Sequence, residues 1–453
     1  MKIKKKFFGT DGIRGKFGDV PLTDYFFFKL AITLSKSKNK ISKILIGKDT
    51  RLSGAFIEKS LFSGFKLMNV ETDFISVVST PIVSFYTKFF KYDYGIMISA
   101  SHNPYYDNGI KIFKKNGEKL NDKEELKIEK ILERIEPKKK IEEKKISYKK
   151  LNYKDYQNSI FKQFKNKKNK LKIVLDCANG SVFEFAPKFF NDVCEKVISY
   201  SVSPNGRNIN KNCGAMFPSR ISKLTKKHKA DIGLSFDGDA DRVIISDDKG
   251  NILDGDIILA MISKYHNFEN GKKIKNIVNT KMCNLAFRDF LKKNKIKLFL
   301  TKVGDRYVIE KMKKTQTILG GEPSGHIILS KNGYCGDGIL TGMFIISIIA
   351  KEQKKLSLLT EHLFKKSFQK LVNLKLKTSP ELILKNAKVK DKLKFIKNKN
   401  KNLDLLIRKS GTENLLRIMV QSRIKNKAND ILTELVTFIK KLDGWCFKNF
   451  IYC

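Results

Sequence analysis

The 453-residue sequence predicts an α/β protein built from several domains. Short apolar runs alternate along it with amphipathic segments, and each run leads into a loop that contains Asp, Ser, Asn or Gly. Four such runs lie at 44–46, 95–98, 172–175 and 232–234. Because domains hold about 100–150 residues, this length corresponds to three or four of them. Ligands of α/β domains collect at the ends of the strands, so these loops are the candidates for function.

Composition shifts along the chain predict where the domains meet. Residues 136–150 are dense in Lys and Glu and indicate a linker, a turn at 248–251 is expected to close a second unit, and the pattern changes again near 363–368. The predicted domains are therefore 1–150, 151–251, 252–366 and 367–453.

The last domain is expected to contain a strand at 405–407 and a terminal helix. Six apolar residues share one face at helical spacing, namely Ile431, Leu432, Leu435, Val436, Ile439 and Leu442. Asn429 and Asp430 are the candidate caps of this helix. The sequence suggests no role for the tail at 443–453.

The charge is extreme, with 91 Lys and Arg against 46 Asp and Glu and a formal net charge of +45. Such a chain first suggests a nucleic-acid partner. Only 11 of the 91 basic residues are Arg, although a surface that binds phosphate and guanine is expected to use the planar guanidinium. The lysines are spread along the whole chain, and Lys, Asn, Ile and Phe all have A/T-rich codons. We therefore attribute the charge to an A/T-biased genome and expect no specific nucleic-acid partner.

The seven cysteines are scattered and include no Cys-x-x-Cys pair, which indicates reduced thiols. The Lys-rich start lacks the apolar segment of a signal peptide. The longest apolar stretch, at 339–350, is interrupted by polar residues and is too short to span a bilayer. We expect a cytoplasmic protein without a membrane partner.

Two loops contain residue types that packing alone does not explain. Ser101 and His102 follow the run at 95–98, although an ordinary polar turn would also explain them. No Gly-x-Ser-x-Gly motif is present, so a hydrolase triad is not indicated. The run at 232–234 leads to three aspartates at alternate positions, Asp237, Asp239 and Asp241. Carboxylates so close together suit one hard cation, and Arg242 stands where an EF-hand loop needs Gly, so we favour a Mg²⁺ site over a chance acidic loop.

Two later loops suit a sugar and a phosphate. Glu322, Ser324 and His326 lie among glycines and can bind hydroxyl groups, with a plain turn as the alternative. The other loop combines guanidinium groups, hydroxyls and a Gly N–H, in Arg408, Ser410, Gly411, Thr412 and Arg417. This composition favours phosphate binding over a solvated turn. No Walker A motif occurs, so the loop is not a nucleotide P-loop.

Together these loops resemble the α-D-phosphohexomutase superfamily. Seven segments occur in the superfamily's order over nearly the whole chain, at 8–15, 101–113, 176–181, 237–242, 304–307, 321–326 and 408–417. The segment at 204–210, with Cys213 and Gly214, resembles the glucosamine-specific branch of the superfamily.

The resemblance implies three related α/β domains and a smaller C-terminal α+β domain around a central cleft. In chain order they would carry the phosphoserine, the metal, the sugar site and the distal phosphate site. The implied ligands of Mg²⁺ are Ser101, Asp237, Asp239 and Asp241. Ser101 would also be the phosphoserine. Arg14, His102, Lys111 and Arg242 would line the transfer site. Glu322, Ser324 and His326 would bind the sugar, and Arg408, Ser410, Gly411, Thr412 and Arg417 would bind the distal phosphate. Lys111 and His326 are both candidates for the general acid/base.

The implied activity converts glucosamine 6-phosphate into glucosamine 1-phosphate through a phosphoserine enzyme and a 1,6-bisphosphate, a step toward UDP-N-acetylglucosamine and the cell wall. The partner would be a small sugar phosphate, and the protein a monomer or a homodimer. Mannose or glucose phosphates are the alternative substrates within the superfamily. A basic nucleic-acid-binding protein with a decayed active site is the alternative outside it, which the presence of the residues needed for phosphoryl transfer disfavours.

Overall fold

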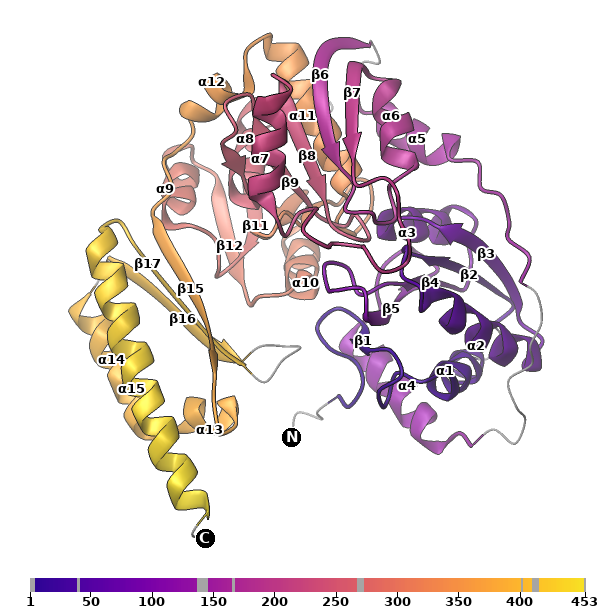
Figure 1. Cartoon of the computed structure of the whole chain (residues 1–453), viewed down its shortest axis with the longest axis horizontal. Coiled ribbons are helices and arrows are strands. Elements are labelled where there is room, and N and C mark those ends of the chain that lie inside the picture. Colours follow the sequence, from indigo (N-terminus) through magenta and orange to yellow (C-terminus); the bar gives the residue numbers. More distant parts are fainter. Residues whose placement is uncertain are drawn as a thin grey trace.

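The computed structural model describes residues 5–38, 41–136, 146–164, 168–266, 273–400, 402–409 and 415–451, with side chains up to residue 444. Four β-sheets follow one another along the chain, and helices cover them (Figure 1). The predicted α/β fold class is therefore confirmed.

The first sheet has five strands in the order β1-β5-β4-β2-β3. Its elements are β1 (Ile13–Lys16), α1 (Asp24–Lys36), β2 (Lys43–Lys48), α2 (Gly54–Leu67), β3 (Glu71–Val77), α3 (Thr80–Phe89), β4 (Tyr94–Ile98), β5 (Asp107–Lys114) and α4 (Asp122–Arg134). Strands β2, β3 and β4 are parallel, and β5 turns back antiparallel to β4. The turn between β4 and β5 therefore carries Ser101 at the end of a fully buried strand.

The second sheet repeats this pattern in the order β10-β9-β8-β6-β7. Its elements are α5 (Lys154–Phe161), β6 (Asn169–Asp176), α6 (Phe185–Asn191), β7 (Cys194–Tyr200), α7 (Pro218–Lys227), β8 (Ile232–Phe236), β9 (Val243–Asp247) and β10 (Ile252–Leu253). The turn at 248–251 joins β9 to β10 within this sheet, so the sheet extends two residues beyond the predicted boundary at 251. The three aspartates lie in the turn between β8 and β9.

The third sheet has the order β12-β11-β13-β14. Its elements are α8 (Gly255–Tyr265), β11 (Asn276–Thr280), α9 (Leu285–Lys293), β12 (Lys297–Thr301), α10 (Asp305–Thr315), β13 (Leu319–Gly321), β14 (Ile327–Leu329), α11 (Gly338–Glu352) and α12 (Leu356–Glu361). Helix α11 is buried along most of its length and belongs to one apolar cluster with residues of the second sheet. The second and third domains therefore share a core, while the fourth has its own.

The fourth domain is an antiparallel sheet in the order β15-β17-β16, with helices packed against it. Its elements are β15 (Phe368–Lys375), α13 (Pro380–Lys385), α14 (Ala387–Lys399), β16 (Leu403–Lys409), β17 (Leu415–Ser422) and α15 (Lys425–Ile451). The predicted strand at 405–407 lies inside β16. The predicted helix caps are wrong, because α15 begins four residues before Asn429 and contains both proposed caps.

The tail also differs from the expectation. Helix α15 continues through it, and the Asp443 carboxylate accepts hydrogen bonds from the backbone N–H groups of Lys377 and Thr378 at 2.8 and 2.9 Å. The Thr378 hydroxyl donates to the same carboxylate at 2.6 Å. The first residue of the tail thus fixes the chain between β15 and α13.

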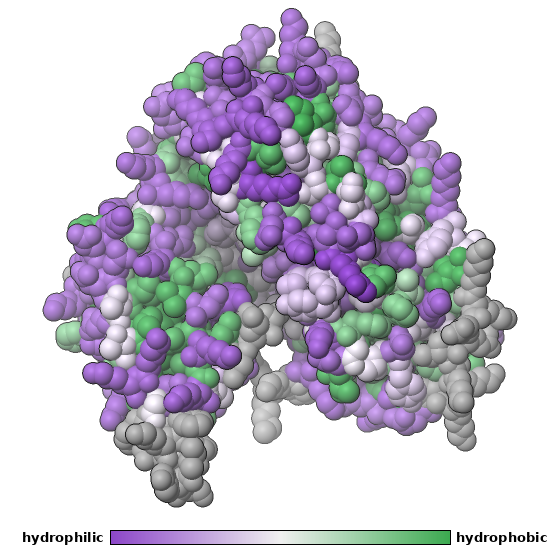
Figure 2. All heavy atoms as spheres, in the orientation of Figure 1, coloured by the Kyte–Doolittle hydropathy of each residue, from purple (hydrophilic) through white to green (hydrophobic). Residues whose placement is uncertain are grey.

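Hydrophilic side chains cover most of the face shown in Figure 2, as the lysine content predicts. Among the described residues, no helix combines the length and the apolar character needed to cross a membrane. The five cysteines whose side chains are described are free and buried.

Candidate active site

Ser101 lies in a tight turn at the carboxyl end of β4. Its φ of +54° is unusual for a residue with a side chain, and such conformations persist only where the surroundings enforce them. The Ser101 hydroxyl donates a hydrogen bond of 2.6 Å to Asp237 Oδ2, and His102 Nδ1 lies 3.4 Å from the same Oγ. The structure therefore brings together a serine and a carboxylate that are 136 residues apart.

Arg51, which the sequence interpretation overlooked, enforces this turn. Its guanidinium pairs with the buried Asp49, with Nε 2.9 Å from Oδ2. It also donates to the carbonyl oxygens of Ser101 and Asn103 at 2.8 Å each, of Asp107 at 2.9 Å, and of Pro104. Four of the five N–H groups of the guanidinium therefore hold the Ser101 loop, and the fifth pairs with Asp49.

Asn210 supports the same loop from the second domain. Its amide donates to the carbonyl oxygens of Ser101 at 2.9 Å and of Asn103 at 3.1 Å. The sequence marked 204–210 only as a segment typical of one branch of a family. The rarity of Arg in this chain is the signal that pointed to other arginines and could also have pointed to Arg51.

The three aspartates of the second loop converge. One carboxylate oxygen from each of Asp237, Asp239 and Asp241 lies within 4.8 Å of the other two, and all three residues are buried. The loop packs directly on the Ser101 turn, since a Cβ at Gly238 would lie only 2.5 Å from the Ser101 carbonyl oxygen. The two loops therefore meet backbone against backbone.

The donor set fits a hard divalent cation. The Oδ1 atoms of Asp239 and Asp241 are buried and accept no hydrogen bond from the described residues. Buried carboxylate oxygens without partners are costly, and oxygen ligands are those that Mg²⁺ prefers. The cluster therefore agrees with the predicted metal position.

Lys111 and Thr80 also contact the aspartates. Lys111 Nζ lies 2.6 Å from both Asp239 Oδ2 and Asp241 Oδ2, and its side chain is fully buried. The Thr80 hydroxyl, at the start of α3, donates to Asp239 Oδ2. Arg14 on β1 donates to the Ala100 carbonyl oxygen at 3.4 Å, beside the serine.

Burial and mutual repulsion set the charges of this site. Burial, together with Asp241 and Asp239, raises the pKa of Asp237 to about 8. Burial alone would also raise the pKa of Asp241, but Lys111, His326 and Arg242 outweigh it and hold that pKa well below its usual range. The carboxylates are thus unequal, as expected for like charges held close together.

The pKa values of the two nearby imidazoles, His102 and His326, shift in opposite directions. Burial, followed by Arg242 and Arg14, lowers the pKa of His102 to about 2, so this ring is neutral beside Ser101. Burial would lower the pKa of His326 too, but Asp241 and Asp305 outweigh burial and raise it. His326 therefore binds its proton more tightly than a free imidazole does.

The third domain contributes the loop between β13 and β14. The Gly304 N–H donates to Glu322 Oε1 at 3.0 Å, and burial raises the pKa of this carboxyl. Ser324 is exposed, whereas His326 is buried. Burial lowers the pKa of the Arg242 guanidinium, but Asp241, Asp237 and Glu322 outweigh burial and raise it.

In the fourth domain, β16 and β17 place Arg408 opposite Arg417. Burial and Arg417 lower the pKa of Arg408, while Glu322 opposes them. Two like charges at adjacent positions favour an anionic partner. The predicted residues Ser410, Gly411 and Thr412 lie outside the described residues.

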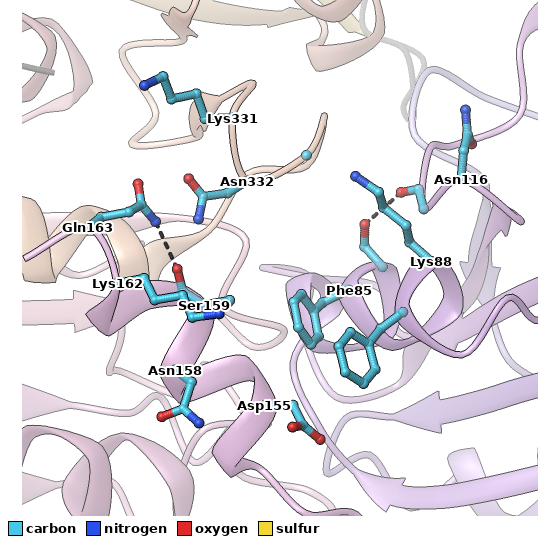
Figure 3. A pocket seen from close by; sticks show the side chains of 14 residues that line it. Phe85, Lys88, Asn116, Asp155, Asn158, Ser159, Lys162, Gln163, Lys331 and Asn332 are labelled. Atoms are coloured by element: carbon cyan, nitrogen blue, oxygen red, sulfur yellow. Dashed lines mark hydrogen bonds between the residues drawn. The ribbon is translucent and has the colours of Figure 1, made fainter. Parts of the chain in front are cut away.

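A cavity of about 610 Å³ lies away from this site (Figure 3). Its walls come from α3, the turn after β5, α5 and the loop after β14, and include Phe85, Lys88, Asn158, Gln163 and Asn332. None of the predicted site residues lines it.

The fold and the site define a member of a known family. The chain matches the models of phosphoglucomutase/phosphomannomutase alpha/beta/alpha domain I over residues 5–139, domain II over 152–250, domain III over 254–367 and the C-terminal domain over 371–437. It therefore belongs to the phosphoglucomutase/phosphomannomutase family of α-D-phosphohexomutases.

Within the family, the chain is similar to proteins named phosphoglucosamine mutase. That of Aliarcobacter butzleri is 40% identical over 446 residues, which cover 96% of this chain and 99% of that protein. That of Bacillus velezensis is 39% identical over 447 residues, with 96% and 98% covered.

The fold is also that of solved phosphohexomutases. A phosphoglucomutase/phosphomannomutase family protein from Burkholderia thailandensis superposes with a TM-score of 0.76 at 20% identity, covering 97% of this chain and 98% of that one. N-acetylphosphoglucosamine mutase from Aspergillus fumigatus, solved with GlcNAc-6P and magnesium, gives a TM-score of 0.66 at 15% identity, with 97% and 96% covered.

Proposed function

We propose that this enzyme interconverts glucosamine 6-phosphate and glucosamine 1-phosphate, with a phosphorylated Ser101 as the donor. The observation that carries the proposal is the 2.6 Å contact between the Ser101 hydroxyl and Asp237 inside a cluster of three buried aspartates. The substrate is carried over from the relatives named phosphoglucosamine mutase, which align over 96% of the chain.

The reaction consists of two phosphoryl transfers. In the first, the bond between phosphorus and Ser101 Oγ breaks, a bond to O1 of glucosamine 6-phosphate forms, the O1 proton passes to a base, and Ser101 Oγ takes up a proton. In the second, the bond between phosphorus and O6 of the resulting 1,6-bisphosphate breaks, a bond to Ser101 Oγ forms, the Oγ proton passes to a base, and O6 takes up a proton. Glucosamine 1-phosphate leaves, and the enzyme is again phosphorylated.

Asp237, Asp239 and Asp241 would hold Mg²⁺ together with the phosphorylated Ser101. When bound, the ion supplies positive charge next to the transferring phosphoryl group. Arg14, Lys111 and Arg242 would add positive charge from the protein.

The remaining residues would hold the sugar and its distal phosphate. Glu322, Ser324 and His326 would contact the hydroxyl and amino groups of the sugar. The distal phosphate would lie against the fourth domain, at Arg408, Ser410, Gly411, Thr412 and Arg417. Each domain would then have one function: the phosphoserine, the metal, the sugar site and the distal phosphate site, in chain order. The proposed domains are 1–150, 151–251, 252–366 and 367–453.

Intact mass tests the covalent donor. The purified protein, incubated with a sugar bisphosphate, is weighed before and after phosphatase treatment. Wild type is expected to lose the mass of one phosphate, and Ser101→Ala to show no such species. A phosphate that remains on Ser101→Ala would place the donor elsewhere.

A coupled assay with glucosamine, glucose and mannose 6-phosphates tests the substrate. We expect the highest kcat/KM with glucosamine 6-phosphate. A clear preference for glucose or mannose would assign the enzyme to another branch of the family, and conversion of none of the three would overturn the proposed function.

A further inference from the structure

Six ionisable side chains, alternately acidic and basic, form a closed ring of contacts beside the candidate metal site. They are Lys111, Asp11, Lys119, Asp305, His326 and Asp241. The first three belong to the first domain, the next two to the third domain, and the last to the second domain. The ring therefore joins three domains at one place.

The first half of the ring connects the metal loop to Lys119. Lys111 Nζ lies 2.6 Å from Asp241 Oδ2 and 3.3 Å from Asp11 Oδ2. The other oxygen of Asp11 contacts Lys119 Nζ. Asp11 thus divides its charge among Lys111, Lys119 and Arg14, which contacts the same oxygen as Lys111.

The second half returns through the third domain. Lys119 Nζ lies 2.5 Å from Asp305 Oδ2, the first residue of α10. The same oxygen lies 3.8 Å from His326 Nε2, and His326 Nδ1 lies 3.5 Å from Asp241 Oδ1. The imidazole thus lies between a carboxylate of the metal loop and one of α10, with Nε2 near Asp305 but without a hydrogen bond to the described residues.

Burial makes this arrangement sensitive to any single change. Side-chain exposure is 12% for Lys119 and 7% for Asp305. Without the Lys119 ammonium, two carboxylates that share it would face each other in a buried place, where water screens them little. Asp11 would then be left with Lys111 and Arg14, and Asp305 with His326.

We infer that Lys119 and Asp305 are positioning residues for phosphoryl transfer. By neutralising Asp11 and orienting His326, they hold Lys111 and His326 against the aspartates around Ser101. This inference rests on the proposed function, but Lys119 and Asp305 themselves touch neither the serine nor the three aspartates. Their substitution should lower kcat more than it changes KM, because neither Lys119 nor Asp305 is among the residues proposed to bind the sugar or the distal phosphate.

Other ion pairs cross the same domain boundary and provide matched controls. Lys313 on α10 pairs with Glu118 of the first domain at 2.5 Å, and Arg306 pairs with the buried Glu125. Neither pair belongs to the ring. A general loosening of the boundary would affect these variants as much as Lys119→Met, whereas positioning would not.

The test measures kcat, KM and urea unfolding for wild type and five variants, namely Lys119→Met, Lys119→Arg, Asp305→Asn, Lys313→Met and Arg306→Met. Lys119→Met and Asp305→Asn are expected to lower kcat by about 100-fold, the effect of an ångström-scale misplacement, with KM within about threefold. Lys119→Arg should restore most of the rate, since guanidinium can bridge two carboxylates. Lys313→Met should keep the kcat of wild type.

Each outcome has one meaning. If wild type converts glucosamine 6-phosphate and Lys119→Met has the kcat of Lys313→Met, the inference is wrong and the proposed function stands. If wild type converts no sugar phosphate, the proposed function fails first. If Lys119→Met does not fold, Lys119→Arg and the isosteric Asp305→Asn still decide, and a wild-type kcat in Asp305→Asn overturns the inference. Equal loss of stability in Arg306→Met and Asp305→Asn, with loss of kcat only in Asp305→Asn, supports it.

Discussion

Replacing Arg51 by lysine keeps the positive charge beside Asp49 but removes the fork that holds the Ser101 turn. The guanidinium of Arg51 makes five side-chain hydrogen bonds, four of them to carbonyl oxygens of the turn. A lysine ammonium has three donors, so at least two of these bonds are lost.

The expected cost follows from those contacts. Hydrogen bonds to charged groups contribute about 1.5–3 kcal/mol each, so the loss of two corresponds to at least about 3 kcal/mol. Arg51→Met should lose more, because it also leaves the buried Asp49 unpaired, and breaking a buried ion pair costs about 3–5 kcal/mol. Without these hydrogen bonds Ser101 can leave its positive-φ conformation, and this displacement should also lower kcat.

Urea unfolding followed by circular dichroism, together with the coupled assay, checks this expectation. Arg207→Met, which changes an exposed arginine, serves as the control. Asn210→Ala should show a coupling of about 0.5–3 kcal/mol with Arg51→Lys, since both side chains bind the carbonyl oxygens of Ser101 and Asn103. Equal urea midpoints and rates for wild type and Arg51→Lys would refute the reasoning.

Three further outcomes are expected. Chelation of divalent cations should abolish sugar phosphate conversion, and added Mg²⁺ should restore it; full activity in chelator would contradict the metal site. Calorimetry should show that Asp239→Asn weakens Mg²⁺ binding more than about tenfold, because loss of a group that only supports a metal ligand already costs about that much. Asp443→Ala should destabilise the fourth domain by about 1–3 kcal/mol through its lost hydrogen bonds, whereas Asp430→Ala, on the exposed side of the same helix, should not; equal urea curves would contradict a role for the tail. Burial raises the pKa of Asp337 to about 6, so the folded chain binds this proton more tightly than the unfolded chain; its contribution to stability is complete below about pH 4 and lost as the pH rises through 6. The difference in unfolding free energy between wild type and Asp337→Asn should therefore change by up to about 3 kcal/mol across that window, and a constant difference would contradict the assignment.

The sequence predicted the parts of the molecule whose signals are local. The apolar runs at 44–46, 95–98, 172–175 and 232–234 lie in β2, β4, β6 and β8, because continuous apolar runs suit strands that are buried on both faces. The three aspartates converge because they follow one strand at alternate positions. In contrast, the start of α15 was misplaced, since polar residues such as Asn429 can lie inside a helix as well as cap it.

Contacts between distant parts of the chain needed either a family resemblance or the structure. Nothing in the local sequence places Ser101 beside Asp237. Arg51 and Lys119 were missed because their partners are backbone carbonyls or residues of another domain, and a lysine among 80 gives no signal of its own. The contact of Asp443 with the β15–α13 connection was missed for the same reason.

The backbone contact at Gly238 has a consequence for how this protein tolerates change. At this point the two main chains pack directly against each other, and no side chain lies between the serine turn and the metal loop. Substitutions of exposed residues should therefore leave the separation of the reacting groups unchanged, in contrast to changes of the buried side chains that hold the two loops. Engineering of surface charge should be permissive in this protein, whereas even Gly238→Ala should be among the least tolerated changes in the chain.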